Sequence, residues 1–200
     1  MADSTMYRMF QVVALLCALP LAGCGAGVPE QPPLAGARIG GKFALTDQNG
    51  RTVRDTDFAG KYRIVYFGYT YCPDVCPTDM AKIGQAMKQL DKEAPRIAEK
   101  VVPIFITVDP ERDTPAAIKQ FVANFHPRVV GLTGSPEAIA AVAKNYAVYF
   151  KKQPPGPGGG YMVDHLAVAF LMGPNGEPIA SLPLEKGGSA IAEQVKHWVR

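Results

Sequence analysis

Long runs of like charge are missing from this chain. Its 21 basic and 18 acidic residues are scattered along 200 positions and leave a formal net charge of +3. A protein that binds nucleic acid usually gathers Lys and Arg into a basic patch or stripe. We therefore expect no nucleic-acid partner.

An apolar run long enough to span a bilayer is also missing. The most apolar stretch, residues 9–19, is cut short by Pro20, whereas a transmembrane helix needs about 20 apolar residues. Arg8 precedes this stretch, and the small residues Ala22 and Gly23 follow it. This layout is typical of a secretory signal.

The end of the same segment predicts a lipid anchor. Residues 21–24, Leu-Ala-Gly-Cys, resemble a bacterial lipobox, in which the signal is cut before a cysteine that then carries lipid. We expect residues 1–23 to be a lipoprotein signal peptide and Cys24 to be lipidated. The alternative is an uncleaved amphiphilic anchor, with Cys17 and Cys24 as bystanders. Both alternatives place the rest of the chain outside the cytoplasm, on the periplasmic side of a membrane.

Cysteine is scarce as well, with four residues in the whole chain. If Cys17 leaves with the signal and Cys24 carries lipid, only Cys72 and Cys76 remain as thiols. In an exported protein such thiols can pair or bind metal, and these two are close enough in sequence to act together.

The remaining composition fits one compact domain on a tether. Hydrophobic residues make up 48% of the chain, and its length suits a single core plus a tail. Residues 24–38 are rich in Gly, Pro and Ala and have little to bury, which is typical of a flexible tether. We place the domain at residues 39–200.

Strands and helices are expected to alternate in the middle of the domain. Apolar runs predict buried strands at 63–69, 101–108 and 129–132, and amphipathic patterns predict helices starting near Pro77, Pro115 and Pro136. Thr114 and Ser135 are suitable N-caps for the last two helices. This alternation predicts an α/β sheet with right-handed crossovers.

The two ends of the domain are expected to be hairpins. At the start, Asn49-Gly50 supplies a tight turn between residues 43–46 and 51–53. Towards the end, the expected elements are a strand at 147–150, a Gly- and Pro-rich loop at 153–160, strands at 163–172 and 178–182, and a helix at 189–200. This order is that of a thioredoxin-like α/β fold with an additional N-terminal β-hairpin.

The chemistry is expected at the turn that carries the two cysteines. Residues 72–77 link the end of a buried strand to the start of a helix. Unpaired N–H groups and the positive end of the helix dipole stabilise a thiolate, so we expect Cys76, with Cys72 as a second candidate, to ionise more readily than ordinary cysteines. Thiolates attack disulfides and bind soft metals.

The spacing of the two cysteines leaves both uses open. Three residues separate Cys72 from Cys76, and the turn between them permits a disulfide or bidentate chelation of a metal. Two sulfurs with one imidazole suit copper, in either oxidation state, better than hard cations.

Only three histidines can supply that imidazole. His197 lies on the final helix, and a cap or dipole contact at a helix end explains His126. His165 is different, because a thioredoxin-like layout would place its strand beside the cysteine turn. The alternative is a core histidine satisfied by backbone. Asp164 precedes it, but neighbouring strand residues face opposite sides, so we do not expect Asp164 to orient the ring.

Three segments strongly resemble the Sco/SenC family: residues 68–77, 108–115 and 163–165. The resemblance extends over residues 39–198. It implies a thioredoxin-like copper protein that helps to assemble the dinuclear copper centre of cytochrome c oxidase, with Cys72, Cys76 and His165 as the copper ligands. The acidic loop 109–113 is implied only as an element beside the site.

Two features depart from the family pattern. Tyr71 stands where many relatives carry another residue, and the loop before His165 is unusually rich in Gly and Pro. We predict that this loop is mobile, so that the histidine closes on copper and opens for transfer.

Our leading hypothesis is therefore a metallochaperone and not an enzyme. It would bind one copper ion, deliver it to the copper-centre subunit of the oxidase, and be served by a thiol reductant or an upstream copper donor. The main alternative is a thiol-disulfide reductase that acts on the oxidase's copper-ligand cysteines through a Cys72–Cys76 pair. A peroxide-reducing enzyme and an inert Cys72–Cys76 disulfide are further alternatives.

Overall fold

The computed structural model describes residues 30–156 and 158–200. The predicted signal peptide, with Cys17, and the lipidation site Cys24 therefore lie outside the described residues. Within the described part, no helix combines the length and hydropathy needed to cross a membrane.

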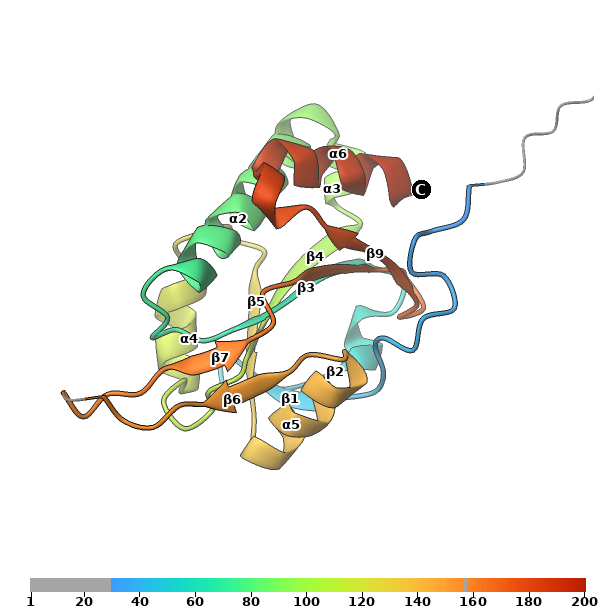
Figure 1. Cartoon of the computed structure of the whole chain (residues 1–200). Coiled ribbons are helices and arrows are strands. Elements are labelled where there is room, and N and C mark those ends of the chain that lie inside the picture. The colour runs from blue at the N-terminus through green and yellow to red at the C-terminus, as the bar shows by residue number, and fades with distance from the viewer. Residues whose placement is uncertain (1–29, 157) are drawn as a thin grey trace, which may run out of the picture. The chain divides into compact units, whose positions relative to one another are not determined.

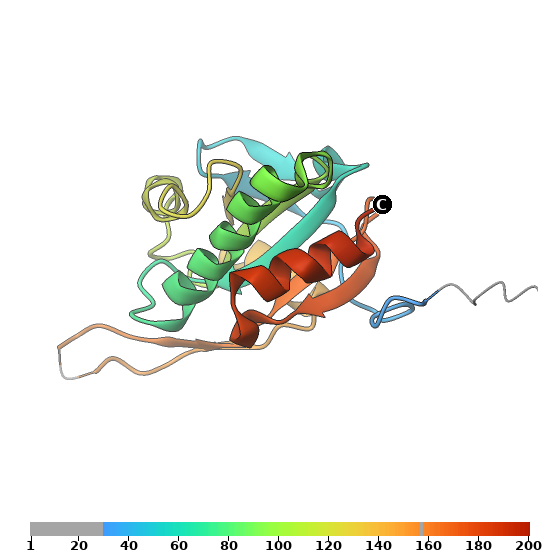
Figure 2. The same cartoon turned by 90° about the horizontal axis from the view of Figure 1, so that it is seen from above.

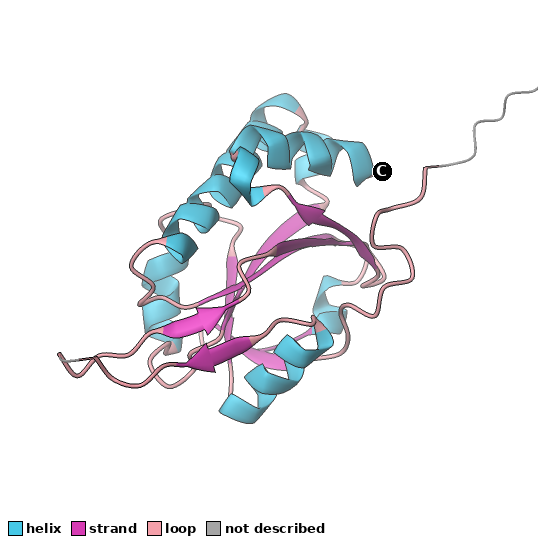
Figure 3. Cartoon of the chain, in the orientation of Figure 1, coloured by secondary structure: helices cyan, strands magenta, loops and turns pink. Residues whose placement is uncertain are grey.

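A mixed seven-stranded sheet forms the centre of the domain, in the order β2-β1-β5-β4-β3-β8-β9 (Figures 1 and 3). The strands β3, β4 and β5 run parallel, and the other pairings are antiparallel. The strand bounds are β1 Ala44–Asp47, β2 Thr52–Arg54, β3 Tyr62–Gly68, β4 Val101–Thr107, β5 Val130–Thr133, β8 Ala169–Met172 and β9 Pro178–Leu182. The expected α/β sheet is present, with the apolar strands β3 and β4 at its centre.

Helices cover both faces of this sheet (Figures 1 and 2). On one face lie α2 Val75–Glu93, α4 Pro115–Val122 and α6 Gly188–Trp198; the opposite face carries α5 Pro136–Asn145. The short elements are α3 Pro95–Ala98, η2 Asp55–Phe58 and η3 Leu184–Lys186. Parallel strands with helical crossovers bury both faces of the sheet, which explains the unbroken apolar runs of β3 and β4.

The helix predictions hold in detail. The stripe of α2, Met80, Ile83, Met87 and Leu90, is fully buried against the sheet. The side chains of Thr114 and Ser135 each accept a backbone N–H three residues on, at 3.2 Å, as N-caps do. The helix α2 begins at Val75, two residues before the expected Pro77, so Cys76 lies inside its first turn.

The prediction of one continuous strand at 163–172 is wrong. The segment forms two strands in different sheets: β7 Val163–His165 pairs with β6 Phe150–Lys152, and β8 pairs with β3. Between them the Leu166 N–H bonds to the Tyr149 carbonyl at 3.0 Å, and the Val168 N–H bonds to the Leu166 carbonyl at 3.1 Å. These bonds turn the chain at residues 166–168, so β7 and β8 diverge. The strand expected at 147–150 is likewise displaced to β6, because Ala147 has a φ of 54°.

The N-terminal part of the domain extends the main sheet. The strands β1 and β2 pair antiparallel around a turn in which Gly50 has a φ of 79°, and β1 also pairs with β5. The Leu34 N–H bonds to the Ile179 carbonyl at 3.0 Å, and the Leu34 side chain packs against the core. Packing thus begins five residues before residue 39, the start expected from composition.

Candidate metal centre

The two cysteines lie where β3 passes into α2. The Cys72 N–H bonds back to the Tyr69 carbonyl at 3.3 Å, which closes the turn after β3. The Cys76 N–H points at the Cys72 sulfur, at 3.5 Å. Cys72 is half-buried, and Cys76 is completely buried under the end of the sheet. The turn thus presents one accessible sulfur and one enclosed sulfur to the same space.

His165 completes the group from a distant part of the chain. Its Nε2 lies 3.2 Å from the Cys76 sulfur. One ligand atom from each of Cys72, Cys76 and His165 lies within 4.8 Å of the others. The structure therefore brings together the three residues predicted as ligands.

The surroundings of His165 favour the tautomer that a metal requires. Its Nδ1 lies 3.3 Å from the Leu166 carbonyl oxygen, which can only accept a hydrogen bond. The proton therefore belongs on Nδ1, and the lone pair of Nε2 faces the sulfurs. Burial lowers the pKa of His165, although the Leu166 carbonyl opposes this shift, so the ring is neutral at neutral pH.

Two tyrosine rings hold this imidazole in place. Tyr69 and Tyr66 meet the His165 ring edge-on, with centroids 5.9 Å and 6.4 Å away. The Tyr66 hydroxyl donates to the carboxylate of Asp79 on α2 at 3.2 Å. Sequence reasoning missed these three residues. Tyr66 and Tyr69 lie six and three positions before Cys72, and this closeness in sequence is the one signal that points to them.

The two thiols differ in acidity, and not in the way expected. Burial raises the pKa of the Cys76 thiol well above its usual value. For Cys72, burial acts in the same direction, but the N–H groups of Cys76 and Asp74 point at the sulfur and lower its pKa. The prediction of an acidic Cys76 is thus wrong, because desolvation outweighs the helix terminus at a fully enclosed sulfur.

Gly68, the last residue of β3, leaves room for the enclosed sulfur. A Cβ at this position would lie 3.0 Å from the Cys76 sulfur, 3.0 Å from Tyr66 Cε1 and 3.1 Å from Phe105 Cε2. Distances this short require one neighbour to move. The absence of a side chain at residue 68 is therefore part of the geometry of the site.

The acidic loop after β4, residues 109–113, supports the cysteine turn through hydrogen bonds. Asp113 is fully buried and accepts hydrogen bonds from the Thr70 N–H at 2.9 Å, the Thr70 hydroxyl at 2.6 Å and the Thr107 hydroxyl at 2.6 Å. It thereby joins the turn before Cys72 to β4. This agrees with the expectation that the loop 109–113 is an element beside the site.

Arg112 joins the same acidic loop to the base of the loop that precedes His165. Its guanidinium lies over the Tyr161 ring at 3.7 Å from the centroid and over the Tyr71 ring at 4.9 Å. It also pairs with Asp109, whose carboxylate accepts the Tyr161 hydroxyl at 2.8 Å. Tyr71 and Tyr161 are thus held by one cation, and the strand that delivers His165 is fixed at Tyr161.

The other candidate residues lie elsewhere or play other parts. His126 bonds to Asp91 at 2.9 Å, and His197 stacks edge-on against Trp198, so neither joins the cysteines. Asp164 accepts a hydrogen bond from Gln153 and does not orient the imidazole, as expected from strand alternation. Both cysteines are free thiols in the structure. A Cys72–Cys76 disulfide remains a prediction for the oxidised form.

This sheet, this strand-to-helix turn and this set of two sulfurs and one imidazole define a thioredoxin-like domain with a site for a soft metal. Residues 31–200 match the model of the SCO1/SenC family, and the chain belongs to that family. The family predicted from the three motifs is therefore confirmed.

Individual relatives give the same answer. The chain is 46% identical over 136 residues to the mitochondrial SCO2 homolog of Bos taurus, and the aligned region covers 68% of this chain and 50% of the relative. It thus spans about half the length of the curated relatives it matches.

Two solved structures extend the comparison. ScoI of Bradyrhizobium japonicum with copper bound is 43% identical with a TM-score of 0.73, covering 80% of this chain and 99% of that one. BsSco, described as having a disulfide switch and as a member of a family of cytochrome c oxidase assembly proteins, is 27% identical with a TM-score of 0.64, covering 84% and 96%. The thioredoxin-like fold class is confirmed by such neighbours. Copper in the first agrees with the metal predicted from the sequence.

Proposed function

We propose that this protein is a copper metallochaperone that delivers one copper ion to the dinuclear copper centre of cytochrome c oxidase. The observation that carries the proposal is the group Cys72, Cys76 and His165, whose ligand atoms lie within 4.8 Å of one another. Two thiolates and one imidazole suit copper, whereas a hard cation such as magnesium prefers oxygen ligands and would bind them weakly. The relatives bound to copper or described as oxidase assembly factors support this function.

The unequal exposure of the two sulfurs suits a metal that must leave again. Cys76 is enclosed and Cys72 is half-exposed, so an incoming ligand can reach the metal from the Cys72 side. The large exposed apolar side chains belong to the cysteine turn and to the segments next to His165: Tyr71, Val75, Tyr149, Met162 and Leu166. Apolar side chains that face solvent around a reactive site are typical of a protein-docking surface. We infer that the copper-centre subunit of the oxidase docks here.

Copper titration of the purified protein tests the proposal. Under reducing conditions the wild type should bind one Cu(I) per chain, and Cys72→Ser, Cys76→Ser and His165→Ala should each lose affinity by at least about tenfold, because each removes one ligand. His197→Ala removes an imidazole outside the site and should bind as the wild type does. Binding should weaken at low pH, since the thiols and imidazole must lose protons before they ligate. Reduced wild-type protein that takes up no copper would overturn the proposal.

A thiol-disulfide reductase is the second candidate, and one observation favours it. The half-exposed Cys72 has a lowered pKa, while Cys76 is buried beside it, as an attacking and a resolving thiol would be. In this function Cys72 attacks a disulfide of the oxidase subunit, which forms a mixed disulfide and frees one thiol of the subunit. Cys76 then attacks the Cys72 sulfur, so the Cys72–Cys76 bond forms and the subunit leaves with both of its cysteines reduced.

The two candidates differ in what they require of His165. A reductase should keep its rate in His165→Ala and lose it in Cys72→Ser, whereas a chaperone should lose copper in both. Disulfide reduction on an oxidised peptide that carries the oxidase's copper-ligand cysteines, measured beside the copper titration, separates the two. After one cycle, an external thiol would reduce the reductase again, and an upstream copper donor would load the chaperone again.

A further inference from the structure

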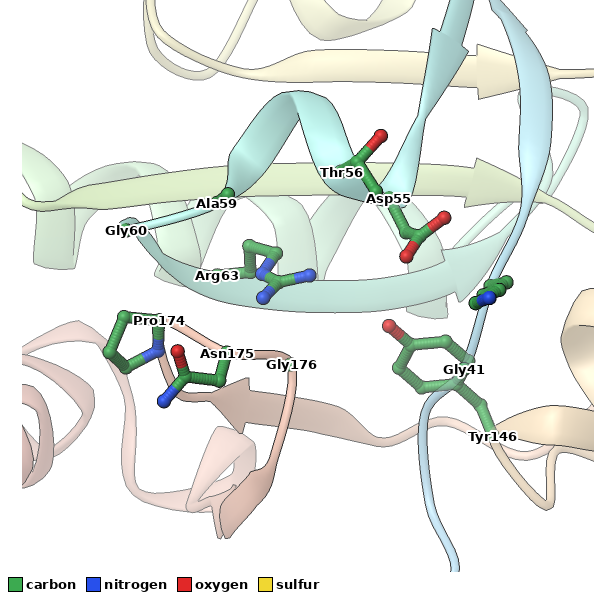
Figure 4. A pocket seen from close by; sticks show the side chains of 11 residues that line it. Gly41, Asp55, Thr56, Ala59, Gly60, Arg63, Tyr146, Pro174, Asn175 and Gly176 are labelled. Atoms are coloured by element: carbon green, nitrogen blue, oxygen red, sulfur yellow. The ribbon is translucent and has the colours of Figure 1, made fainter.

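A cavity of about 390 Å³ lies beside the start of β3, whereas the two cysteines follow the end of that strand. Gly68 lies five positions after Arg63 on this strand, which corresponds to roughly 17 Å. The walls include Gly41, Asp55, Arg63, Tyr146 and the turn 174–176 (Figure 4). None of the three copper-ligand residues lines it, so the cavity needs an explanation of its own.

Arg63 is the unusual member of this lining. It is 4% exposed, and its Nη2 donates to the Gly173 carbonyl at 2.9 Å. Its Nε is buried without a hydrogen-bond partner. Across residues 30–156 and 158–200, no carboxylate forms an ion pair with it. Of the five N–H donors of this guanidinium, one bonds to a carbonyl of the described residues, and the Nε–H is enclosed with no acceptor.

A buried charge with so little compensation costs free energy, and a native protein usually supplies a counter-ion or other hydrogen-bond partners. We propose that the cavity binds a small oxyanion, a carboxylate or a phosphate, with the Arg63 guanidinium as its main contact. This site is separate from the proposed copper function and does not rest on it.

Two neighbours of Arg63 suit such a ligand. Tyr146 lines the cavity, and its hydroxyl points into the same space as the guanidinium (Figure 4). Burial raises the pKa of Tyr146 to about 12, so the hydroxyl keeps its proton and can donate. Gly176 has a φ of 88°, and a Cβ there would lie 3.4 Å from Nη2 and 3.7 Å from Nη1 of Arg63. Glycine thus leaves the space beside the guanidinium open.

Charges at the wall limit which anion fits. Asp55 lines the cavity and accepts the Phe43 N–H at 3.2 Å, while Lys42 lines it with an opposite charge. With Arg63 these groups leave one net positive charge around the cavity. A ligand with a single negative charge, such as lactate or dihydrogen phosphate, balances that charge, whereas Asp55 repels a polyanion.

The test is an NMR titration of the wild-type protein at pH 6 with sodium lactate or sodium phosphate, at an ionic strength held constant with sodium chloride. The Arg63 Nε–H and the backbone amides of Gly60 and Gly176 should shift and saturate with at least one of the two anions. Saturation with lactate only, or with phosphate only, identifies which oxyanion the site takes. Shifts that grow linearly without saturation in both titrations would overturn the proposal.

Variants connect the binding to the cavity. Arg63→Gln should weaken it by about tenfold or more, because a charged hydrogen bond is lost. Arg51→Gln, which removes an exposed arginine elsewhere, should leave it unchanged. Since a substitution at a buried residue can unfold the protein, Tyr146→Phe gives a second test, with an expected loss of about fivefold. Equal binding by wild type and Tyr146→Phe, or by wild type and a folded Arg63→Gln, would contradict the assignment.

Discussion

Glycine at position 68 is the point where a single methyl group would disturb the metal site. In Gly68→Ala the new Cβ would lie 3.0 Å from the Cys76 sulfur and 3.1 Å from the Phe105 ring, both buried in the core. We expect the free energy of unfolding to fall by about 1–3 kcal/mol, as in other overpacked cores. Copper affinity should fall as well, because the sulfur must shift. Urea denaturation and a competition titration with a Cu(I) chelator measure the two effects.

The control for this substitution is Gly158→Ala, where a Cβ would meet nothing within 4 Å. It should change neither quantity. If Gly68→Ala bound copper and unfolded as this control does, the contact with Cys76 would not constrain the site.

Asp113 acts on the site through Thr70. In Asp113→Asn the carboxylate that accepts three hydrogen bonds becomes an amide, whose NH₂ group faces donors from Thr70 and Thr107. We expect a loss of about 1–3 kcal/mol in the free energy of unfolding, and weaker copper binding because the turn before Cys72 is released. Glu111→Gln changes an exposed carboxylate of the same loop and should affect stability little. Similar denaturation curves for the two variants would contradict this role for Asp113.

At the level of residues, the three members of the candidate metal site were predictable, and the residues that support them were not. Cys72 and Cys76 are four positions apart and lie at a strand-to-helix turn, and His165 follows from the family motif. Tyr66 reaches the site because its ring meets an imidazole that is 99 positions further along the chain. Such contacts come from the packing of distant elements, so no local pattern encodes them.

The Gly- and Pro-rich loop between β6 and β7 is the element that we expect to respond to copper. A Cβ at Gly158, Gly159 or Gly160 would meet nothing within 4 Å, so the tip has little packing. Its base is tied down where Tyr161 bonds to Asp109 and stacks on Arg112. Copper bound to His165 would fix β7 and restrain the residues beside it. Hydrogen exchange of residues 156–161 should therefore slow when Cu(I) binds, and equal protection in both states would contradict the prediction.

The turn between β1 and β2 makes part of the stability depend on pH. Burial alone would raise the pKa of Asp47, but the N–H groups of Arg51 and Asn49, each 2.8 Å away, lower it below 3.8. Because the folded pKa lies below the unfolded one, the contribution of Asp47 is complete above about pH 4 and is lost as the pH falls through the folded pKa.

The variant Asp47→Asn isolates this contribution. It should lower the free energy of unfolding at neutral pH by about 1–2 kcal/mol, since charged hydrogen bonds become neutral ones. Urea denaturation from pH 7 downwards should show a smaller acid-dependent loss for the variant than for the wild type. Parallel pH profiles for the two proteins would assign the loss to other carboxylates.

For the molecule as a whole, sequence periodicity predicted most of the sheet and missed one division. The run 163–172 is apolar throughout its second half and reads as one strand, yet backbone bonds at Leu166 and Val168 divide it. The Leu166 bond depends on the Tyr149 carbonyl, which lies just before β6 in another part of the chain. The separate sheet β6–β7 therefore could not be read from the pattern of residues, although it is this sheet that carries His165 to the cysteines.

The attachment of this domain to a membrane is the remaining prediction at this scale. We propose that Cys24 carries lipid and holds the copper domain on the periplasmic side. Acyl chains contribute about 0.8 kcal/mol per buried CH₂ group, so losing them should release the protein. Cys24→Ala removes the residue that is lipidated, so it should block processing of the signal. When residues 1–23 of this variant are replaced by a cleavable export signal, the protein should be soluble in the periplasm. Cys17→Ala changes the other cysteine of the same segment, and this variant, like the wild type, should stay in the membrane fraction and be labelled by fatty acid. If Cys24→Ala and Cys17→Ala both stay in the membrane fraction and the wild type takes up no fatty acid, the uncleaved amphiphilic anchor is the correct alternative, because it depends on neither cysteine.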